Sequence, residues 1–410
     1  MESVSRRAIA RNSFVLYLPM GIATLLPTFG MSIANVALPT FTVTFSQSLA
    51  NVQWVVSAYL FALTVFSLLA GRVADGVGAR TTLLLGYLAF VAGSVVCYFA
   101  ANLPILIAGR VVQGTGAAAL AVVAISLAKS IGGEDKLGRA MGTMATLTAV
   151  GTALGPSVGG IVLELFGWRT LFLLLIAGAG FGVLSVGFIP AQSPRWKQAD
   201  SGAIGSDNTS LVEYVVPAIA NCFVSVIMMT TFIAGPFFLT YALGFSEGGV
   251  GIVMAIGPVI SVLAGVPSGY LVDRLGPQRV MAVGLSQLVI GALCFAFLPN
   301  IWGIGGYVVA LIVMTPGYQM FLAANNTSVM RGVPDHRRGV ISGLLNMSRN
   351  AGLILGASAI AALFMWGAGT PDLQSAGVSQ IGDAFKLVFL VNAALITGAG
   401  VMLFLARNER

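Results

Sequence analysis

Charged residues are scarce in this chain: only 9% of its 410 residues are Asp, Glu, Lys or Arg, whereas 57% are hydrophobic. A soluble globular protein has about 25% charged residues, so this chain has too few of them to cover a surface that faces water. The mean hydropathy is +0.93. The composition therefore indicates an integral membrane protein and excludes an ordinary water-soluble domain.

Cysteine and histidine are also rare. The three cysteines, Cys97, Cys222 and Cys294, lie far apart in apolar runs, and His336 is the single histidine. No spacing typical of a metal site is present, so we expect the cysteines to serve packing. The sequence also contains no nucleophile–base pair and no phosphate-binding loop. We therefore expect neither enzymatic activity nor a bound cofactor or metal.

Long apolar segments are abundant. Twelve of them reach the roughly 20 residues that a membrane-spanning helix needs. They cover residues 14–38, 51–72, 79–100, 103–127, 138–163, 167–190, 212–240, 247–271, 278–299, 302–326, 339–365 and 382–406. The polar segment 191–211 separates two sets of six. We predict an all-α membrane fold of two pseudo-symmetric six-helix bundles, at 1–190 and 212–410, with 191–211 as a cytoplasmic linker.

Basic residues are distributed unevenly along this predicted topology. Seventeen of the 21 Lys and Arg residues lie at the termini and in the even-numbered connections, and two lie in the odd-numbered ones. Because positive residues remain on the cytoplasmic side, we expect both termini to be cytoplasmic in a multi-pass protein of the cell membrane. This distribution also explains the net charge of +7, so we expect no nucleic-acid partner.

A short internal repeat relates the two halves. GRVADGVGAR at 71–80 and GYLVDRLGPQR at 269–279 both follow the second span of their half. Three residue pairs are 198 positions apart: Gly71 and Gly269, Asp75 and Asp273, Gly78 and Gly276. Six spans per half make the repeats parallel, which is the design of one large class of transporters with a substrate site between the halves.

Several motifs resemble those of the major facilitator superfamily. GRVADGVGAR resembles the loop motif G-x-x-x-D-x-x-G-R-[RK], and LIAGRVVQGTGAAAL at 106–120 is similar to the fourth-span motif R-x-x-Q-G-x-G. GTALGPSVGG at 151–160 is similar to the fifth-span motif G-x-x-x-G-P-x-x-G-G, which marks drug:proton antiporters. The resemblance covers essentially the whole chain and implies multidrug efflux by alternating access.

The resemblance also implies gating residues. In the family, the loop motif holds the cytoplasmic side closed, and its matching positions here are Gly71, Arg72, Asp75, Gly78, Arg80 and, in the second copy, Asp273. Alternatively, the two aspartates are solvated turn residues, with Gly78 supplying the backbone of a tight turn.

Glycines in the fifth span form a regular stripe. Gly151, Gly155 and Gly159 are four residues apart, so they share one helix face and allow a neighbouring helix to approach closely. Pro156 removes one backbone hydrogen bond, and we expect it to bend the helix. We interpret the segment as a contact face and a hinge that seals the outer half of the pathway.

Two arginines fall within apolar spans. Arg110 lies about seven residues into its span, roughly 10 Å deep by helical rise, with Gln113 on the same face. A charge at that depth is usually functional, although an arginine can also extend to the membrane surface. Arg349 forms a polar strip with Asn346 and Asn350, which serves either interhelical hydrogen bonding or substrate binding. Asn35, Tyr59 and Tyr318 complete the candidate substrate cavity.

Acidic residues are absent from the middle of every span. All fourteen Asp and Glu residues lie at or near the predicted membrane surfaces. The antiporter branch commonly has an aspartate five residues before the asparagine of the first span, and here that position is Gly30. Arginines without an opposing carboxylate should make the cavity positive, which favours neutral or anionic substrates over cations.

Two functions remain open. The first is a secondary transporter that exports small amphipathic molecules by proton antiport, with the proton gradient as its energy source. The second is a metabolite or organic-anion transporter, by uniport or symport, without a proton carboxylate in the membrane. A scaffold without transport activity would need a soluble domain, and no segment is long enough. We expect a monomer in contact with membrane lipid and a small-molecule substrate.

Overall fold

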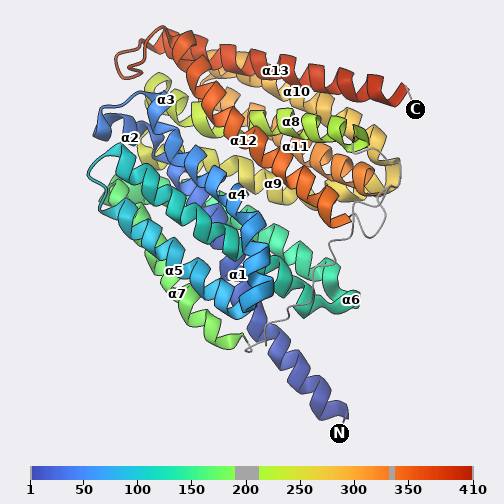
Figure 1. Ribbon diagram of the computed structural model, residues 1–410. Helices are drawn as coiled ribbons and strands as arrows, with labels where there is room; N and C mark the ends of the chain where they lie inside the picture. The colour runs from blue at the N-terminus through green and yellow to red at the C-terminus, as the bar shows by residue number, and fades with distance from the viewer. Residues whose placement is uncertain (1, 190–211, 332–337, 409–410) are drawn as a thin grey trace. The chain divides into compact units, whose positions relative to one another are not determined.

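The computed structural model describes residues 2–189, 212–331 and 338–408, and the described residues contain helices and no strand. Within each described range the helices follow one another with short connections, as Figure 1 shows. Their bounds are α1 (Glu2–Val36), α2 (Leu38–Phe45), α3 (Leu49–Val52), α4 (Trp54–Val77), α5 (Ala79–Tyr98), α6 (Leu103–Phe166), α7 (Trp168–Ser185), η1 (Val186–Phe188), α8 (Val212–Phe237), η2 (Phe238–Ala242), α9 (Glu247–Leu275), α10 (Pro277–Trp302), α11 (Ile304–Arg331), α12 (Arg338–Ala368) and α13 (Val378–Asn408).

The number of spans agrees with the prediction. Among the described residues, eleven helical segments are long and apolar enough to cross a membrane, or twelve when the bent pair Leu18–Val36 and Leu38–Phe45 counts as one. The two parts of this pair meet at 57°. Helix α6 contains two of the spans, Leu103–Ala124 and Thr146–Phe166. The fold is therefore an all-helical, multi-pass membrane fold.

Local sequence signals explain where several helices begin and end. The Asn102 side chain accepts a hydrogen bond from the Ile105 backbone N–H at 3.0 Å and caps the start of α6. Ser246 caps α9 in the same way through Gly249. Gly78 and Gly276 end one helix and start the next with φ of +86° and +81°, a conformation that favours glycine. The tight turn that the sequence allows at Gly78 is therefore present, and Gly276 forms the corresponding turn in the second copy of the loop motif.

The chain forms two compact units. The first contains Met1–Ala37 and Trp54–Ala199, and the second contains Leu38–Gln53 and Asp200–Arg410. The expected linker, 191–211, lies outside the described residues. The segment 38–53 follows the first span in sequence, yet it belongs to the second unit. There the Thr40 hydroxyl donates a hydrogen bond to the Glu247 carboxylate at the start of α9.

Close glycine contacts hold helix pairs together in each unit. A Cβ atom at Gly93 of α5 would lie 2.7 Å from Gln113 Cα of α6, and one at Gly291 of α10 would lie 2.7 Å from Met314 Cα of α11. A Cβ atom at Gly86 would lie 3.0 Å from Ala119 Cβ of α6, and one at Gly284 would lie 2.8 Å from the Phe321 backbone nitrogen of α11. Gly86 and Gly284, like Gly93 and Gly291, are 198 positions apart. The repeat therefore extends from the loop motif into the packing of corresponding helix pairs.

The glycine stripe of α6 packs against α1, as expected. A Cβ atom at Gly151 would lie 2.7 Å from the Leu25 carbonyl oxygen, and one at Gly155 would lie 2.6 Å from Ser32 Cβ. The Ser32 hydroxyl donates a hydrogen bond to the Gly151 carbonyl at 3.2 Å. A Cβ atom at Gly159 would lie 2.7 Å from Ile33 Cγ1. The predicted close approach is confirmed, whereas the hinge at Pro156 and the gating role stay predictions.

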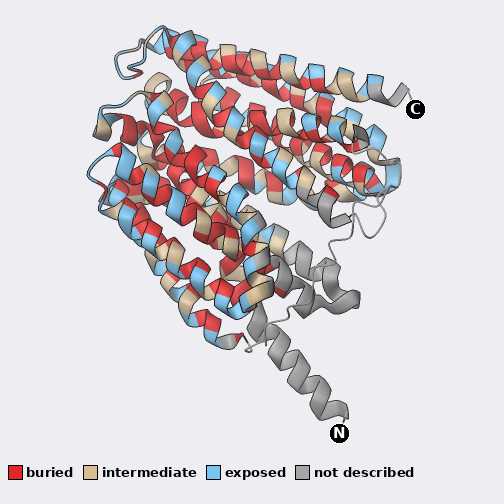
Figure 2. Ribbon diagram, viewed as in Figure 1, coloured by how far each residue is buried: buried red, intermediate tan, exposed pale blue. Residues whose placement is uncertain are grey.

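Exposed apolar side chains cover the outside of the helices. Val266, Leu184 and Trp366 expose 84%, 74% and 74% of their surface. Figure 2 shows exposed and buried residues alternating along individual helices. In water such a surface would be unfavourable, but a bilayer is as apolar as these side chains. These exposed apolar side chains therefore suit contact with lipid.

Candidate functional site

Arg110 of α6 lies at the centre of a polar network in the first unit. Its side chain is completely buried. Nε donates to the Val55 carbonyl of α4 at 2.9 Å, and Nη1 donates to the Gly30 carbonyl of α1 at 3.0 Å. Nη1 also donates to Gln113 Oε1. One arginine therefore joins three helices, and it does not extend to the membrane surface.

Tyr59 and Gln113 complete this network. The Arg110 guanidinium carbon lies 4.1 Å from the centre of the Tyr59 ring, within the range of a cation–π interaction. The Tyr59 hydroxyl donates to the Pro27 carbonyl of α1 at 2.8 Å. Gln113 Nε2 donates to the Ser94 hydroxyl of α5 at 2.7 Å. The structure thus brings together three of the predicted residues, and it adds Ser94.

The charge of Arg110 is balanced by dipoles. Among the described residues, its hydrogen bonds go to two carbonyl oxygens and one amide oxygen, and none goes to a carboxylate. Its Nη2 is buried and has no hydrogen-bond partner there. A buried charge that lacks an opposite charge is costly. The two N–H donors of Nη2 therefore stay unpaired within the described part of the chain, and the site carries a net positive charge. Both properties suit a carbonyl, hydroxyl or anionic group.

Gly30 lies against the packed interior of the first unit. A Cβ atom there would lie 3.0 Å from Phe90 Cζ of α5 and 3.8 Å from Leu175 Cδ1 of α7. The α1 backbone supplies a carbonyl to Arg110 at this position, where related antiporters commonly carry a carboxylate. Arg110 is therefore bound here by the Gly30 backbone carbonyl, without a carboxylate side chain at this position.

Asn35 does not join the network in the described part of the chain. It is buried, and its Nδ2 donates weakly to the Met31 carbonyl of its own helix at 3.4 Å. Its Oδ1 is buried without a partner among the described residues. Asn35 is therefore a separate polar residue on α1, about one and a half helical turns beyond Gly30.

The second unit places Tyr318 beside Arg349. Tyr318 of α11 is 7% exposed and lies near Ser225 of α8 and near the charge of Arg349 of α12. Asn346 and Arg349 are exposed, whereas Asn350 is buried. The predicted strip on α12 therefore divides into two exposed residues and one packed residue. Its assignment to substrate binding stays a prediction.

Sequence reasoning missed two buried asparagines of the second unit. Asn221 of α8 donates to the Leu345 carbonyl at 2.8 Å and to the Ser348 hydroxyl at 3.0 Å, both on α12. Asn392 of α13 donates to Thr230 of α8 at 2.8 Å. Each is an asparagine in an otherwise apolar span, which is the same signal that singled out Asn35. These hydrogen bonds join α8 to α12 and α13 and stabilise the packing of the three helices.

The gating residues are described only in part. The side chains of Arg72 and Asp75 lie outside the described residues. Arg80 and Asp273 are exposed, and a Cβ atom at Gly71 would meet nothing within 4 Å. The gating role of these residues therefore stays a prediction.

Comparison with known proteins identifies a family and several relatives of this chain. Residues 20–357 match the Major Facilitator Superfamily. The riboflavin transporter RibZ of Clostridioides difficile (strain 630) is 25% identical over 404 residues, which cover 86% of this chain and 89% of RibZ. The multidrug resistance protein Stp of Mycobacterium tuberculosis (strain CDC 1551 / Oshkosh) is also 25% identical, with 84% and 75% covered.

Solved structures support the same fold. A bacterial homologue of the human lysosomal transporter Spinster, in an inward-facing and unoccupied conformation, has a TM-score of 0.78 at 15% identity. The alignment covers 96% of each chain. This family consists of transporters and not of enzymes. The chain belongs to the Major Facilitator Superfamily, and within it resembles the drug:proton antiporter branch that carries out multidrug efflux.

Proposed function

We propose that this transporter exports small amphipathic molecules, neutral or anionic, across the cell membrane by alternating access and in exchange for protons. The observation that carries the proposal is the buried Arg110, whose Nη2 has no hydrogen-bond partner and which has no carboxylate partner among the described residues. A positive charge at an interior site attracts an anion and repels a cation. At 4 Å and an effective dielectric constant of 20, the interaction is about 4 kcal/mol.

Relatives favour export as the direction of transport. Stp is named a multidrug resistance protein, and the glycine stripe packed against α1 resembles the motif that marks drug:proton antiporters. Both termini are proposed to be cytoplasmic, because the basic residues gather on their side. The protein is proposed to act as a monomer.

A second function is favoured by a specific observation. RibZ, which is 25% identical over most of the chain, is named a riboflavin transporter. No acidic residue occupies the middle of a span, so coupling to protons has no obvious carboxylate. A metabolite or organic-anion transporter that works by uniport or symport would satisfy both facts.

Transport into inverted membrane vesicles would separate these functions. The substrates are a matched set with one aromatic body and a trimethylammonium, a methyl or a sulfonate group, offered with and without an imposed pH gradient. We expect uptake of the neutral and anionic members, at least tenfold above that of the cation, and acceleration when the vesicle interior is acidic. Preferred uptake of the cation would contradict the proposed selectivity, and indifference to the gradient would favour the second function.

A further inference from the structure

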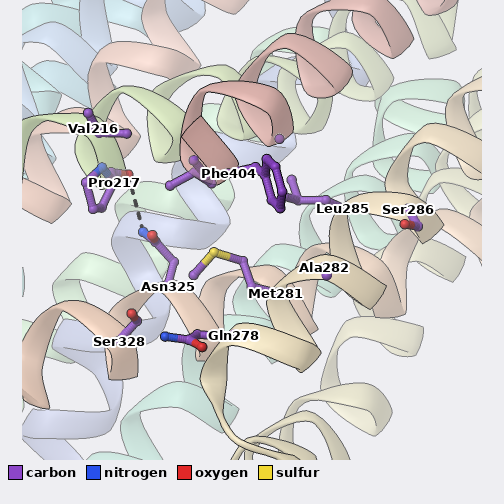
Figure 3. A pocket seen from close by; sticks show the side chains of 12 residues that line it. Val216, Pro217, Gln278, Met281, Ala282, Leu285, Ser286, Asn325, Ser328 and Phe404 are labelled. Atoms are coloured by element: carbon purple, nitrogen blue, oxygen red, sulfur yellow. Dashed lines mark hydrogen bonds between the residues drawn. The ribbon is translucent and has the colours of Figure 1, made fainter. Parts of the chain in front are cut away.

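A cavity of about 620 Å³ lies within the second unit, between α8, α10, α11 and α13. None of the candidate site residues described above lines it. Its volume falls in the range of roughly 300–1,000 Å³ that is usual for small-molecule sites. Figure 3 shows side chains from separate helices converging on this space. The cavity is therefore large enough to hold a ligand of drug size.

The position of the cavity along the helices shows where it opens. Pro217 lies near the start of α8, Gln278 is the second residue of α10, and Ser328 lies near the end of α11. Phe404, near the end of α13, also lines the cavity and is 61% exposed. The cavity therefore lies at one end of the unit, beside an apolar surface that faces lipid.

The floor of the cavity carries an unsatisfied polar group. Asn325 of α11 is completely buried, and its Nδ2 donates to the Pro217 carbonyl at 3.4 Å (Figure 3). Its Oδ1 is buried and has no partner among the described residues. Buried carbonyl oxygens are normally hydrogen-bonded, and an exception needs an explanation. A ligand with a hydrogen-bond donor would satisfy this oxygen.

We propose that this cavity binds an amphipathic small molecule that enters from the membrane, with an apolar body and a hydroxyl or amine that donates to Asn325 Oδ1. Met281 and Leu285 supply apolar walls, and the exposed Gln278 and Ser328 lie at the mouth. An acyl chain fills apolar space but offers no donor for the buried oxygen. An anion is disfavoured at the floor because Asn325 presents an acceptor. The site goes beyond the proposed function, since it lies within one unit and requires no transport.

Two matched probes test the chemistry of the site. 2-Naphthol and 2-methoxynaphthalene share one ring system, and only the naphthol donates a hydrogen bond. Equilibrium dialysis measures their binding to the full chain in phosphatidylcholine nanodiscs, with empty nanodiscs as background. We expect saturable binding that is about tenfold tighter for 2-naphthol. 2-Methoxynaphthalene has no hydrogen-bond donor, so it leaves Asn325 Oδ1 unsatisfied.

Variants connect that binding to the cavity. Asn325→Leu should reduce the affinity for 2-naphthol about tenfold, to that of 2-methoxynaphthalene. Gly400→Leu should abolish the binding of both probes, because Gly400 lines the cavity and its Cβ atom would lie 3.7 Å from Leu285 Cδ1. Gly398→Leu is the control on the same helix, since a Cβ atom there meets nothing within 4 Å. Should Gly400→Leu not fold, Ala282→Phe, which also narrows the cavity, takes its place.

The outcomes decide the proposal without reference to transport. Equal affinities for the two probes, unchanged by Asn325→Leu, would mean an apolar groove for lipid chains and would overturn it. Lack of saturable 2-naphthol binding, or binding that survives Gly400→Leu and Ala282→Phe alike, would also overturn it.

Discussion

At the scale of single residues, the central feature is a permanent charge held by backbone carbonyls. Arg110 contacts α1, α4 and its own helix through three separate N–H bonds and also lies over the Tyr59 ring. A guanidinium group fits this arrangement because its donors form a rigid planar fork. An ammonium group has the same charge, but all its donors are on one nitrogen atom, so it cannot form this planar fork.

Arg110→Lys tests whether the geometry or only the charge is needed. We expect transport to fall at least about tenfold while the protein still inserts into the membrane. The unfolding free energy should decrease by about 1–3 kcal/mol, because the Val55 or Gly30 carbonyl loses its partner. Vesicle transport and thermal unfolding in detergent measure the two effects. Normal transport by the lysine variant would show that charge alone suffices, and an unfolded variant would assign Arg110 a purely structural role.

Gly30→Asp restores the carboxylate that related antiporters commonly carry. The sequence alone favours a shift of selectivity toward cations, but a side chain at this position meets Phe90 at 3.0 Å. We therefore expect the single variant to be destabilised, and the shift toward cations to appear only with Phe90→Leu in the same chain. The ratio of cation to neutral uptake is the measurement. A stable single variant that already prefers cations would show that the aspartate reaches the pathway without rearrangement.

At the scale of helices, α1 and α6 pack through glycine where other residues would not fit. Gly155→Ala should lower the unfolding free energy by about 1–3 kcal/mol, the usual cost of overpacking. The added Cβ atom would lie 2.6 Å from Ser32 Cβ and 2.9 Å from the Ile33 backbone nitrogen. Gly180→Ala on α7 is the matched control, because a Cβ atom there meets nothing within 4 Å. It should be neutral or stabilising by up to about 1 kcal/mol. Equal effects in thermal unfolding would contradict a specific contact at Gly155.

Helix packing also shows how far sequence reasoning reaches. The loop glycines 198 positions apart predicted a repeat, and applying the same offset to Gly86 and Gly93 would have found the packing of α5 on α6 and of α10 on α11. The burial of Arg110 followed from its position in an apolar span. Its partners could not be predicted, because backbone carbonyls carry no sequence signal. The place of residues 38–53 in the second unit depends on tertiary contacts such as Thr40 with Glu247.

At the scale of the whole molecule, the composition and the span count predicted a multi-pass helical membrane fold, and the repeat and the motifs predicted a transporter. The span count of the structure and the family match confirm both predictions. Substrate and coupling are less constrained, since this fold accommodates many solutes. The lack of a mid-span carboxylate distinguishes this chain from the branch that it resembles. Proton antiport needs a group that binds and releases a proton within the pathway, and no such carboxylate is found in the middle of a span. Coupling through the substrate or through Asp75 would remove that difficulty.

Proton movement driven by substrate is the most direct test of proton antiport by this transporter. The purified protein is reconstituted into liposomes that contain a pH-sensitive dye, and a neutral amphipathic substrate is added outside without a pH gradient. We predict that substrate entry moves protons out and raises the internal pH, and that Arg110→Lys reduces this signal in proportion to transport. Substrate accumulation with no change in internal pH would contradict proton antiport.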